Sequence, residues 1–204
     1  MFSKNSNNYY GDKDLDGIMN MKDLDMDGDG ILNIDDPDAN NNRKKNIEDI
    51  IEIAGRMEGV YHDRFEGGLY GLFSRFGFLS NIDVVLKPYD YAGIFLGKEM
   101  GEDFKEDSSD YFGTPEKDYL FHSRVENLYT YCKHKDLFID TQNELKKGDI
   151  IFYKKGSKLN HTSLLVEDPD LVLDAGVESQ VIEIGRENVG KEFGNINYYC
   201  RILK

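Results

Sequence analysis

The sequence predicts an α+β fold in which helices pack on an antiparallel sheet, with a small Asp-rich segment at the N-terminus. Apolar residues recur at helical spacing in residues 47–54, and short β-type runs follow one another after residue 148. Residues 12–36 repeat Asp, Gly and Asn at fixed offsets. Helices that precede a run of strands, rather than alternating with them, are typical of α+β proteins.

Composition limits the classes of partner. The chain has 204 residues, and a hydrophobic fraction of 39% is enough to build a core. Residues 1–42 contain ten Asp against three Lys, which is half of the formal net charge of −14. This charge speaks against nucleic acid or an anionic membrane as partner and favours a divalent cation. No run of about 18 apolar residues occurs, so we expect no membrane span.

Three regions follow from these patterns. Residues 1–11 are polar and Asn-rich and are expected to be disordered. Residues 12–42 form the Asp-rich repeats, and residues 43–204 form the second domain. The N-terminal residues lack the apolar stretch of a secretory signal, so either a signal has been removed or the protein leaves the cell by another route.

Within the second domain we expect helices first. Ile47, Ile50, Ile51 and Ala54 mark one buried helix face. Residues 58–80 are expected to form an irregular loop, and residues 98–120 are expected to form turns. Helices are expected at residues 81–92, where Pro88 kinks or ends the helix, and at residues 122–134. The expected strands are Ile150–Tyr153, Thr162–Glu167, Leu171–Leu173, Val181–Ile184 and Ile196–Leu203.

Two consecutive twelve-residue loops carry the pattern of calcium binding. Such a loop needs oxygen ligands at positions 1, 3 and 5, Gly at 6, a backbone carbonyl at 7, a polar group at 9 and a carboxylate at 12. The first loop has its Gly at Gly17 and the second at Gly30. The predicted ligands are Asp12, Asp14, Asp16, Ile18, Asn20 and Asp23, then Asp25, Asp27, Asp29, Ile31, Asn33 and Asp36.

Position 8 is apolar in both loops (Met19 and Leu32), and we expect these side chains to pack between the loops. The segment resembles thrombospondin type 3 repeats and dockerin-type loops, which implies a structural role for Ca²⁺ outside the cytoplasm. A solvated acidic linker is the alternative.

Three segments of the second domain carry a further resemblance. They are Leu145–Tyr153 with Asn160–Glu167, then Val172–Gly176, then Asp83–Leu86, Ala92–Ile94 and His122–Leu128. Together they resemble an uncharacterised bacterial branch of the NlpC-type superfamily of papain-like cell-wall cysteine hydrolases. The resemblance implies a papain-like domain, a Cys nucleophile at the start of the first core helix, His161 as base and Asp174 as the residue that orients it.

The chain departs from that pattern at the nucleophile, where Ser80 stands in place of Cys. Three explanations are open: a Cys-to-Ser replacement that inactivates the enzyme, a natural Ser nucleophile, or a domain that only binds. Cys132 neighbours His134, but residues at this spacing do not form a dyad, so we expect a small buried thiol. A disulfide between Cys132 and Cys200 is compatible with the sequence but not required.

His122 and Arg124 are candidate substrate-binding residues, because Arg pairs with carboxylates in a forked geometry. A helix-capping and salt-bridge cluster explains them equally well. The expected function is hydrolysis of an amide or peptide bond in the stem peptide of peptidoglycan, in the bacterial wall or in the periplasm of a target cell. The alternatives are a calcium-stabilised secreted binding module and an antibacterial effector, which would have an inhibitor (immunity) protein as partner.

Overall fold

The computed structural model describes residues 11–59, 81–115, 117–118, 121–140, 145–167, 169–176 and 180–203. The predicted disorder of the first residues and most of the predicted loop at 58–80, including Ser80, therefore lie outside the described residues.

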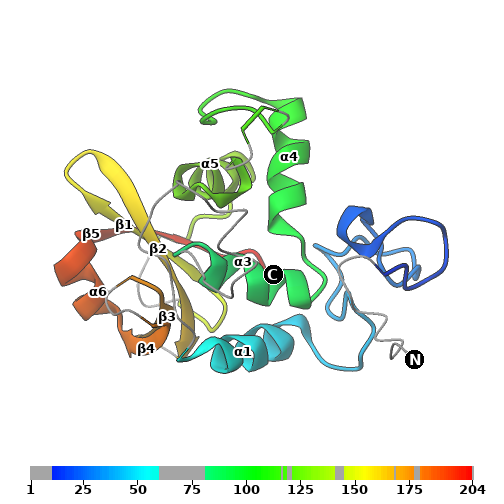
Figure 1. Cartoon of the computed structure of the whole chain (residues 1–204), viewed down its shortest axis with the longest axis horizontal. Helices are drawn as coiled ribbons and strands as arrows, with labels where there is room; N and C mark the ends of the chain where they lie inside the picture. Colours follow the sequence, from blue (N-terminus) through cyan, green and yellow to red (C-terminus); the bar gives the residue numbers. More distant parts are fainter. Residues whose placement is uncertain are drawn as a thin grey trace.

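The described chain is an α+β structure with five α-helices and one antiparallel sheet (Figure 1). The helices are α1 (Asn46–Met57), α3 (Asp83–Tyr91), α4 (Leu96–Glu106), α5 (Val125–His134) and α6 (Arg186–Phe193), with short 3₁₀ helices at Asn20–Lys22 and Phe121–Ser123. The strands are β1 (Ile150–Lys155), β2 (Lys158–Glu167), β3 (Leu171–Asp174), β4 (Ile182–Gly185) and β5 (Asn195–Cys200). All five predicted strands are present, and the predicted α+β class with an antiparallel sheet is confirmed.

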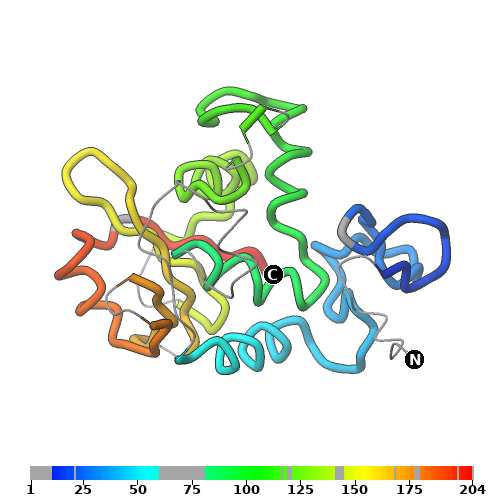
Figure 2. Tube along the Cα trace, in the orientation of Figure 1, coloured from blue at the N-terminus to red at the C-terminus, as the bar shows by residue number. Residues whose placement is uncertain are grey.

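Both faces of the sheet are covered. The strand order is β4-β3-β2-β1-β5, so β1 and β2 lie inside the sheet. Alternate residues point to opposite faces: Phe152 and Leu164 join the larger core with α1, α3, α4 and α5, whereas Tyr153 and Leu165 join a smaller core with α6. In Figure 2 the N-terminal Asp-rich segment lies at the opposite end of the molecule from the β1–β2 hairpin.

The turn that leads into β1 is fixed by contacts from three other elements. Gly148 has a φ of +88°, and a Cβ there would lie 2.7 Å from Cδ1 of Ile47 on α1. Tyr89 of α3 donates its hydroxyl to the Gly148 carbonyl at 2.7 Å. Asp149 is buried and accepts a forked pair from Arg201 at 2.9 and 2.8 Å. The Gly-Asp pair therefore joins α1, α3 and the C-terminal segment to β1.

Two helices were not predicted. Residues 98–120 were expected to be turns because they are highly charged, but α4 begins at Leu96 and buries Leu96, Met100 and Asp103 at helical spacing. That prediction was wrong for residues 98–106, since tertiary packing stabilised a helix with a weak apolar pattern. Helix α6 buries only Arg186 and Val189, which is too few residues to produce a periodic signal.

Cys132 of α5 and Cys200 of β5 form a disulfide. The expectation that Cys132 is buried is confirmed, since it is 0% exposed, but the expectation of a free thiol was wrong. The half-cystines are 68 residues apart in sequence. They meet because β5 pairs with β1 on one side, and on its other side Cys200 pairs with Phe138, which follows α5. The bond ties the helical layer to the sheet.

None of the helices in the described ranges has the length and apolar composition that crossing a bilayer requires.

We predict that Cys132→Ser together with Cys200→Ser lowers the free energy of unfolding by about 2–4 kcal/mol, because the denatured chain regains the freedom of a 68-residue loop. Urea denaturation monitored by circular dichroism measures the change. An unchanged midpoint in the double variant, with dithiothreitol also having no effect on the parent chain, would contradict this expectation.

Candidate active site and metal loops

His161 and Asp174, predicted as base and orienting residue, are in direct contact. His161 lies on β2 and is 1% exposed, and Asp174 ends β3 and is 0% exposed. Nε2 of His161 lies 2.6 Å from Oδ2 of Asp174. Because the carboxylate accepts, the Nε2 nitrogen carries the proton, and this fixes the tautomer of the neutral ring.

The other ring nitrogen faces the start of α3. Nδ2 of Asn81 lies 3.4 Å from Nδ1 of His161 and 3.5 Å from the Asn160 carbonyl oxygen. With the proton on Nε2, Nδ1 is a lone-pair acceptor that is directed toward residue 81. Asn81 was not among the predicted site residues, although its place two residues before α3 could have indicated a role.

The imidazole ring is held between aromatic and backbone surfaces. Phe193 of α6 stacks on it, with ring centroids 3.7 Å apart and planes 8° from parallel. A Cβ added at Gly176 would lie 2.6 Å from Cε1 of His161, so only glycine leaves room for the ring. Tyr153 packs beside it and shares a 2.9 Å hydrogen bond with Ser163. Sequence reasoning missed Phe193, because α6 itself was missed.

No thiol is present to act as a nucleophile. The chain contains two cysteines, and both are in the disulfide. Ser80, the predicted replacement, precedes Asn81 directly in the chain but lies outside the described residues. The structure therefore brings together His161, Asp174 and Asn81 and leaves the three explanations for position 80 open.

Arg124 and His122 make contacts of a structural kind. Arg124 binds Asp118 through Nε at 3.0 Å and a terminal nitrogen at 2.9 Å, and its guanidinium lies 4.6 Å from the centre of the Phe112 ring. His122 packs against α4, 3.4 Å from where a Cβ at Gly97 would lie. Burial lowers the pKa of His122. These contacts favour the salt-bridge alternative, and the substrate role stays a prediction.

A hollow of about 560 Å³ lies between the Asp-rich segment and the start of β1, lined by residues that include Pro37, Tyr89, Lys147 and Arg201. Neither His161 nor Asp174 lines it. It therefore belongs to the junction between the two parts of the chain.

The two Asp-rich loops each gather three carboxylates. Ligand oxygens of Asp12, Asp14 and Asp16 lie within 4.8 Å of one another, and so do those of Asp25, Asp27 and Asp29. The first Asp of each loop accepts the position-6 amide, at 3.0 Å for Gly17 and 2.9 Å for Gly30. The three carboxylates within each cluster repel one another, so this arrangement suits a hard divalent cation that binds between them.

Buried carboxylate oxygens test that fit. Oδ1 of Asp12, Oδ2 of Asp23 and Oδ1 of Asp25 are buried and have no hydrogen-bond partner among the described residues. Burial, with the neighbouring carboxylates, raises the pKa values of Asp23, Asp27 and Asp36. A bound cation would give these oxygens a partner and would offset the negative charge of the neighbouring carboxylates. The residues therefore fit a divalent metal.

The Asn at position 9 of each loop closes the loop. Oδ1 of Asn20 accepts the Lys13 amide at 2.9 Å, and Oδ1 of Asn33 accepts the Met26 amide at 2.8 Å. This role was not predicted, and the predicted role of these two residues as ligands stays a prediction. The carbonyls of Ile18 and Ile31 likewise stay predicted ligands.

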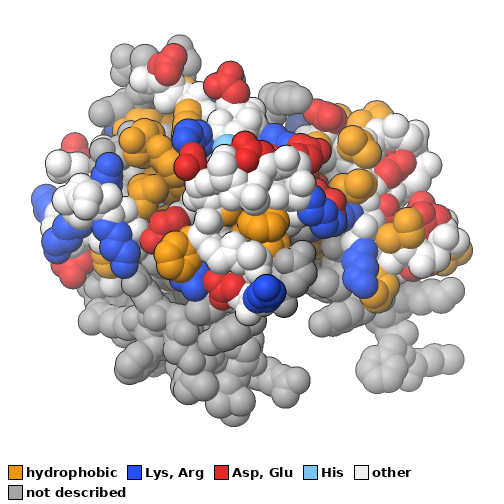
Figure 3. Space-filling model, turned by 90° about the horizontal axis from the view of Figure 1, so that it is seen from above, with side chains coloured by type: hydrophobic (Ala, Val, Ile, Leu, Met, Phe, Trp, Pro, Cys, Tyr) orange, Lys and Arg blue, Asp and Glu red, His pale blue; other side chains and the backbone are white. Residues whose placement is uncertain are grey.

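The predicted packing of the position-8 residues was wrong. Leu32 is 50% exposed and Met19 is 37% exposed. Instead Met26, at position 2, is buried against Gly93 after α3. Figure 3 shows hydrophobic side chains beside acidic ones at the right of the molecule, where Figure 1 places the Asp-rich segment.

Comparison with known proteins gives one family. The family model described as "Domain of unknown function (DUF1287)" matches residues 77–181, which include the start of α3, His161 and Asp174. No curated protein matches the chain.

We predict that Asp174→Ala lowers the free energy of unfolding by about 1–3 kcal/mol, because the buried imidazole N–H loses its acceptor. Glu183→Ala, an exposed acid on the neighbouring strand β4, is the control and should change it by less than about 0.5 kcal/mol. Urea denaturation of both variants measures the difference, and equal effects would contradict a buried bond.

Proposed function

As the chain belongs to the family described as "Domain of unknown function (DUF1287)", whose description names no activity, we propose from the site itself that it is a hydrolase of amide or peptide bonds in the stem peptide of peptidoglycan. We further propose that its second domain has the papain-like, NlpC-type architecture. The observation that carries the proposal is the buried Asp174–His161 pair, whose second ring nitrogen faces Asn81, one residue after Ser80.

In the proposed reaction the Oγ atom of Ser80 attacks the carbonyl carbon of the scissile amide, and its proton passes to Nδ1 of His161. The C–N bond then breaks, and the amine leaves with that proton. Water attacks the resulting ester, gives a proton to His161, and the bond between Ser80 and the acyl group breaks as the hydroxyl is restored. Asp174 keeps the imidazole in the required tautomer and stabilises the imidazolium.

The N-terminus of α3 supports this chemistry. Its first residue, Asp83, lies three positions after Ser80, so the amide groups and the positive end of the helix dipole are near in sequence to the attacking atom. Amide donors at a helix start are suited to stabilise the oxyanion of the tetrahedral intermediate.

The chain's own bonding supports a location outside the cytoplasm. The disulfide between Cys132 and Cys200 is of a kind that persists in oxidising compartments and is rare where thiols are kept reduced. The proposed Ca²⁺ sites point the same way, since weak Asp-rich loops fill only where calcium is abundant. The bacterial wall and the periplasm of a target cell are both oxidising and supplied with calcium. An inhibitor protein as partner stays a prediction that applies to delivery into a target-cell periplasm.

A secreted binding module is the second candidate. It is favoured by one observation: both cysteines form the disulfide, so the thiol nucleophile of the resembled hydrolases is missing. Such a module would keep the fold and bind the wall without cutting it.

Digestion of purified peptidoglycan, with mass spectrometry of the soluble fragments, tests the proposal. We expect stem-peptide fragments from the parent chain or from Ser80→Cys, and at least about 100-fold less when His161→Ala is added. Glu183→Gln is the matched control and should leave the rate unchanged.

Each outcome separates the explanations for position 80. Release by the parent chain identifies a natural Ser nucleophile, and release by Ser80→Cys alone identifies a replaced Cys. No release by either form, together with sedimentation of the folded chain on peptidoglycan, would replace the hydrolase by the binding module.

We also predict that about 1 mM Ca²⁺ raises the free energy of unfolding by about 0.4–1.4 kcal/mol for each occupied loop, for dissociation constants of about 0.1–1 mM. Thermal unfolding with Ca²⁺, Mg²⁺ or EDTA measures the change, and Asp14→Asn should remove part of it. Identical unfolding temperatures in Ca²⁺ and EDTA would exclude a structural calcium role.

A further inference from the structure

The 13-residue period of the Asp-rich segment continues for one more turn. Positions 1 of the two predicted loops are Asp12 and Asp25, and the next position in register is Asp38. From there the ligand positions 3, 5 and 12 fall on Asn40, Asn42 and Asp49. The third repeat matches the sequence pattern poorly, because Asn replaces Asp at positions 3 and 5 and position 6 is Arg43 instead of Gly.

The backbone follows the same path in all three repeats. Positions 4 and 6 are left-handed each time, even where the residue is not glycine. The φ values at position 4 are 69° (Leu15), 72° (Gly28) and 44° (Asn41), and at position 6 they are 95° (Gly17), 93° (Gly30) and 72° (Arg43). Arg43 therefore adopts the conformation for which the other two loops use glycine.

The loop-closing hydrogen bonds are also the same. Asp38 accepts the Arg43 amide at 2.9 Å, as the first Asp of each other loop accepts its position-6 amide. Asn46, at position 9, accepts the Ala39 amide at 3.0 Å and donates to the Asp36 carbonyl at 2.6 Å. Asn33 makes the corresponding pair of bonds one repeat earlier. Residues 38–49 are thus a structural copy of the first two loops.

A copied loop alone would not be a site, and the second observation is Asp49. Its side chain is 1% exposed, and Oδ1 has no hydrogen-bond partner among the described residues. Oδ2 accepts from the side-chain amides of Asn40 and Asn42, both at 2.7 Å. Positions 3, 5 and 12 therefore converge on one point. The Oδ1 atoms of Asn40 and Asn42 accept the amides two residues further on, at 3.1 and 2.8 Å, as the position-3 and position-5 carboxylates of the first loop do. Each of these oxygens has a second lone pair that can face a cation, which would then take the place of the two amide groups beside Asp49.

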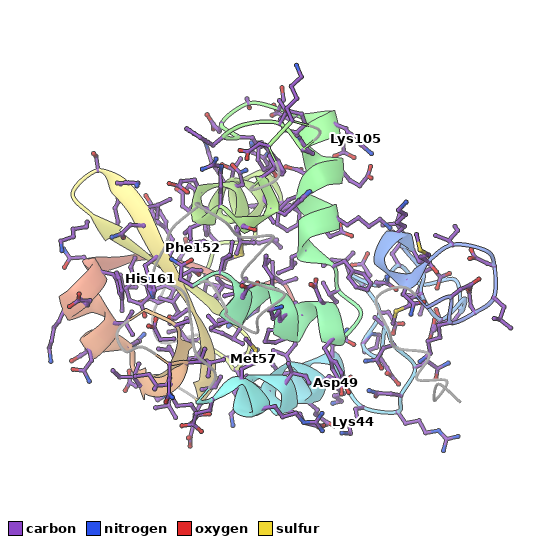
Figure 4. All side chains as sticks on the ribbon, in the orientation of Figure 1. Lys44, Asp49, Met57, Lys105, Phe152 and His161 are labelled. Atoms are coloured by element: carbon purple, nitrogen blue, oxygen red, sulfur yellow. A yellow bond between two sulfur atoms is a disulfide. The ribbon has the colours of Figure 1, made fainter. Side chains whose placement is uncertain are left out.

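We propose that residues 38–49 bind a third Ca²⁺ ion, with oxygen ligands from Asp38, Asn40, Asn42, Asp49 and the Lys44 carbonyl. This deepens the proposed calcium role and rests on it. In Figure 4 Asp49 and Lys44 lie together at the end of α1 that faces the Asp-rich segment.

Charge predicts that this site is the weakest of the three. It has two carboxylates where each of the other loops has four, and the ammonium group of Lys13 contacts the Asn40 carbonyl. Calcium affinity rises with the number of charged ligands. The third ion would then be the last to bind and the first to leave.

The location implies that this ion would link the repeats to the second domain, a role that the other two ions would not have. Asp49 lies in the first turn of α1, and Asn40 also donates to the carbonyl of Tyr91 at the end of α3, at 3.2 Å. A cation held by Asp38 and Asp49 would join the repeats to the helix pair of the second domain. The boundary predicted at residue 43 falls inside this loop.

Calcium titration of the metal-free full chain tests the proposal. Native mass spectrometry counts the ions, and the amide resonances of Gly17, Gly30 and Arg43 report one loop each. We expect three ions and shifts at all three amides, with Arg43 shifting at the highest calcium concentration. Asp49→Asn should bind two ions, and the control Glu48→Gln, an exposed acid one residue earlier, should bind three.

A gain-of-affinity variant separates a metal loop from a purely structural Asn–Asp network. Asn42→Asp restores the residue that the other loops have at position 5, and we expect it to tighten the third site at least fivefold. It also keeps the test valid if Asp49→Asn does not fold. Two ions with an unmoved Arg43 amide, or no tightening in Asn42→Asp, would overturn the third site alone. No bound ion at all would overturn the proposed calcium role as well.

Discussion

The hydrogen-bonded ladders on the two sides of β1 are the constraint on which the rest of the structure depends. Pairing with β2 sets Tyr153 opposite His161, and pairing with β5 sets Ile150 opposite Cys200. The first ladder places Tyr153 beside the candidate catalytic His161, and the second places Cys200, which forms the disulfide with Cys132, next to β1. Because a shift of one residue would turn every side chain of β1 to the other face, the two cores on the two faces hold this register.

The buried His161–Asp174 pair is an energetically costly feature that the fold tolerates. A buried imidazole and carboxylate lose solvation that their mutual attraction only partly restores, so the pair contributes little to stability compared with apolar residues of the same size. Its close fit between Phe193 and Gly176 restricts the ring to one orientation. The buried hydrogen bond and the fixed ring are why this pair, and not the hollow beside the Asp-rich segment, supports the proposed reaction.

The Asp-rich segment is joined to the second domain by more than its chain connection. Met26 and Ala39 pack on Gly93, and Asn40 binds both Asp49 of α1 and the end of α3. A segment that binds calcium at this junction would link metal concentration to the packing of α1. The same carboxylates that repel one another without an ion would then hold the two parts together with it.

The sequence by itself determined the features that depend on local pattern. These are the α+β class, the five strands and the register of the first two Asp-rich loops, since residue alternation and fixed Asp–Gly spacing are properties of neighbours in the chain. It also identified His161 and Asp174, although only through a resemblance, and their contact needed β2 and β3 to pair. Their roles in a reaction remain predictions.

Only the tertiary structure decided what depends on distant residues. Cys132 meets Cys200 because the segment that follows α5 pairs with β5, and α4 is helical because Leu96, Met100 and Asp103 are buried by other elements. Phe193 reaches His161 from a helix too short to leave a periodic signal. The third repeat became visible only from φ at Arg43 and from the buried oxygen of Asp49, because conformation and burial are set by packing and not by residue type.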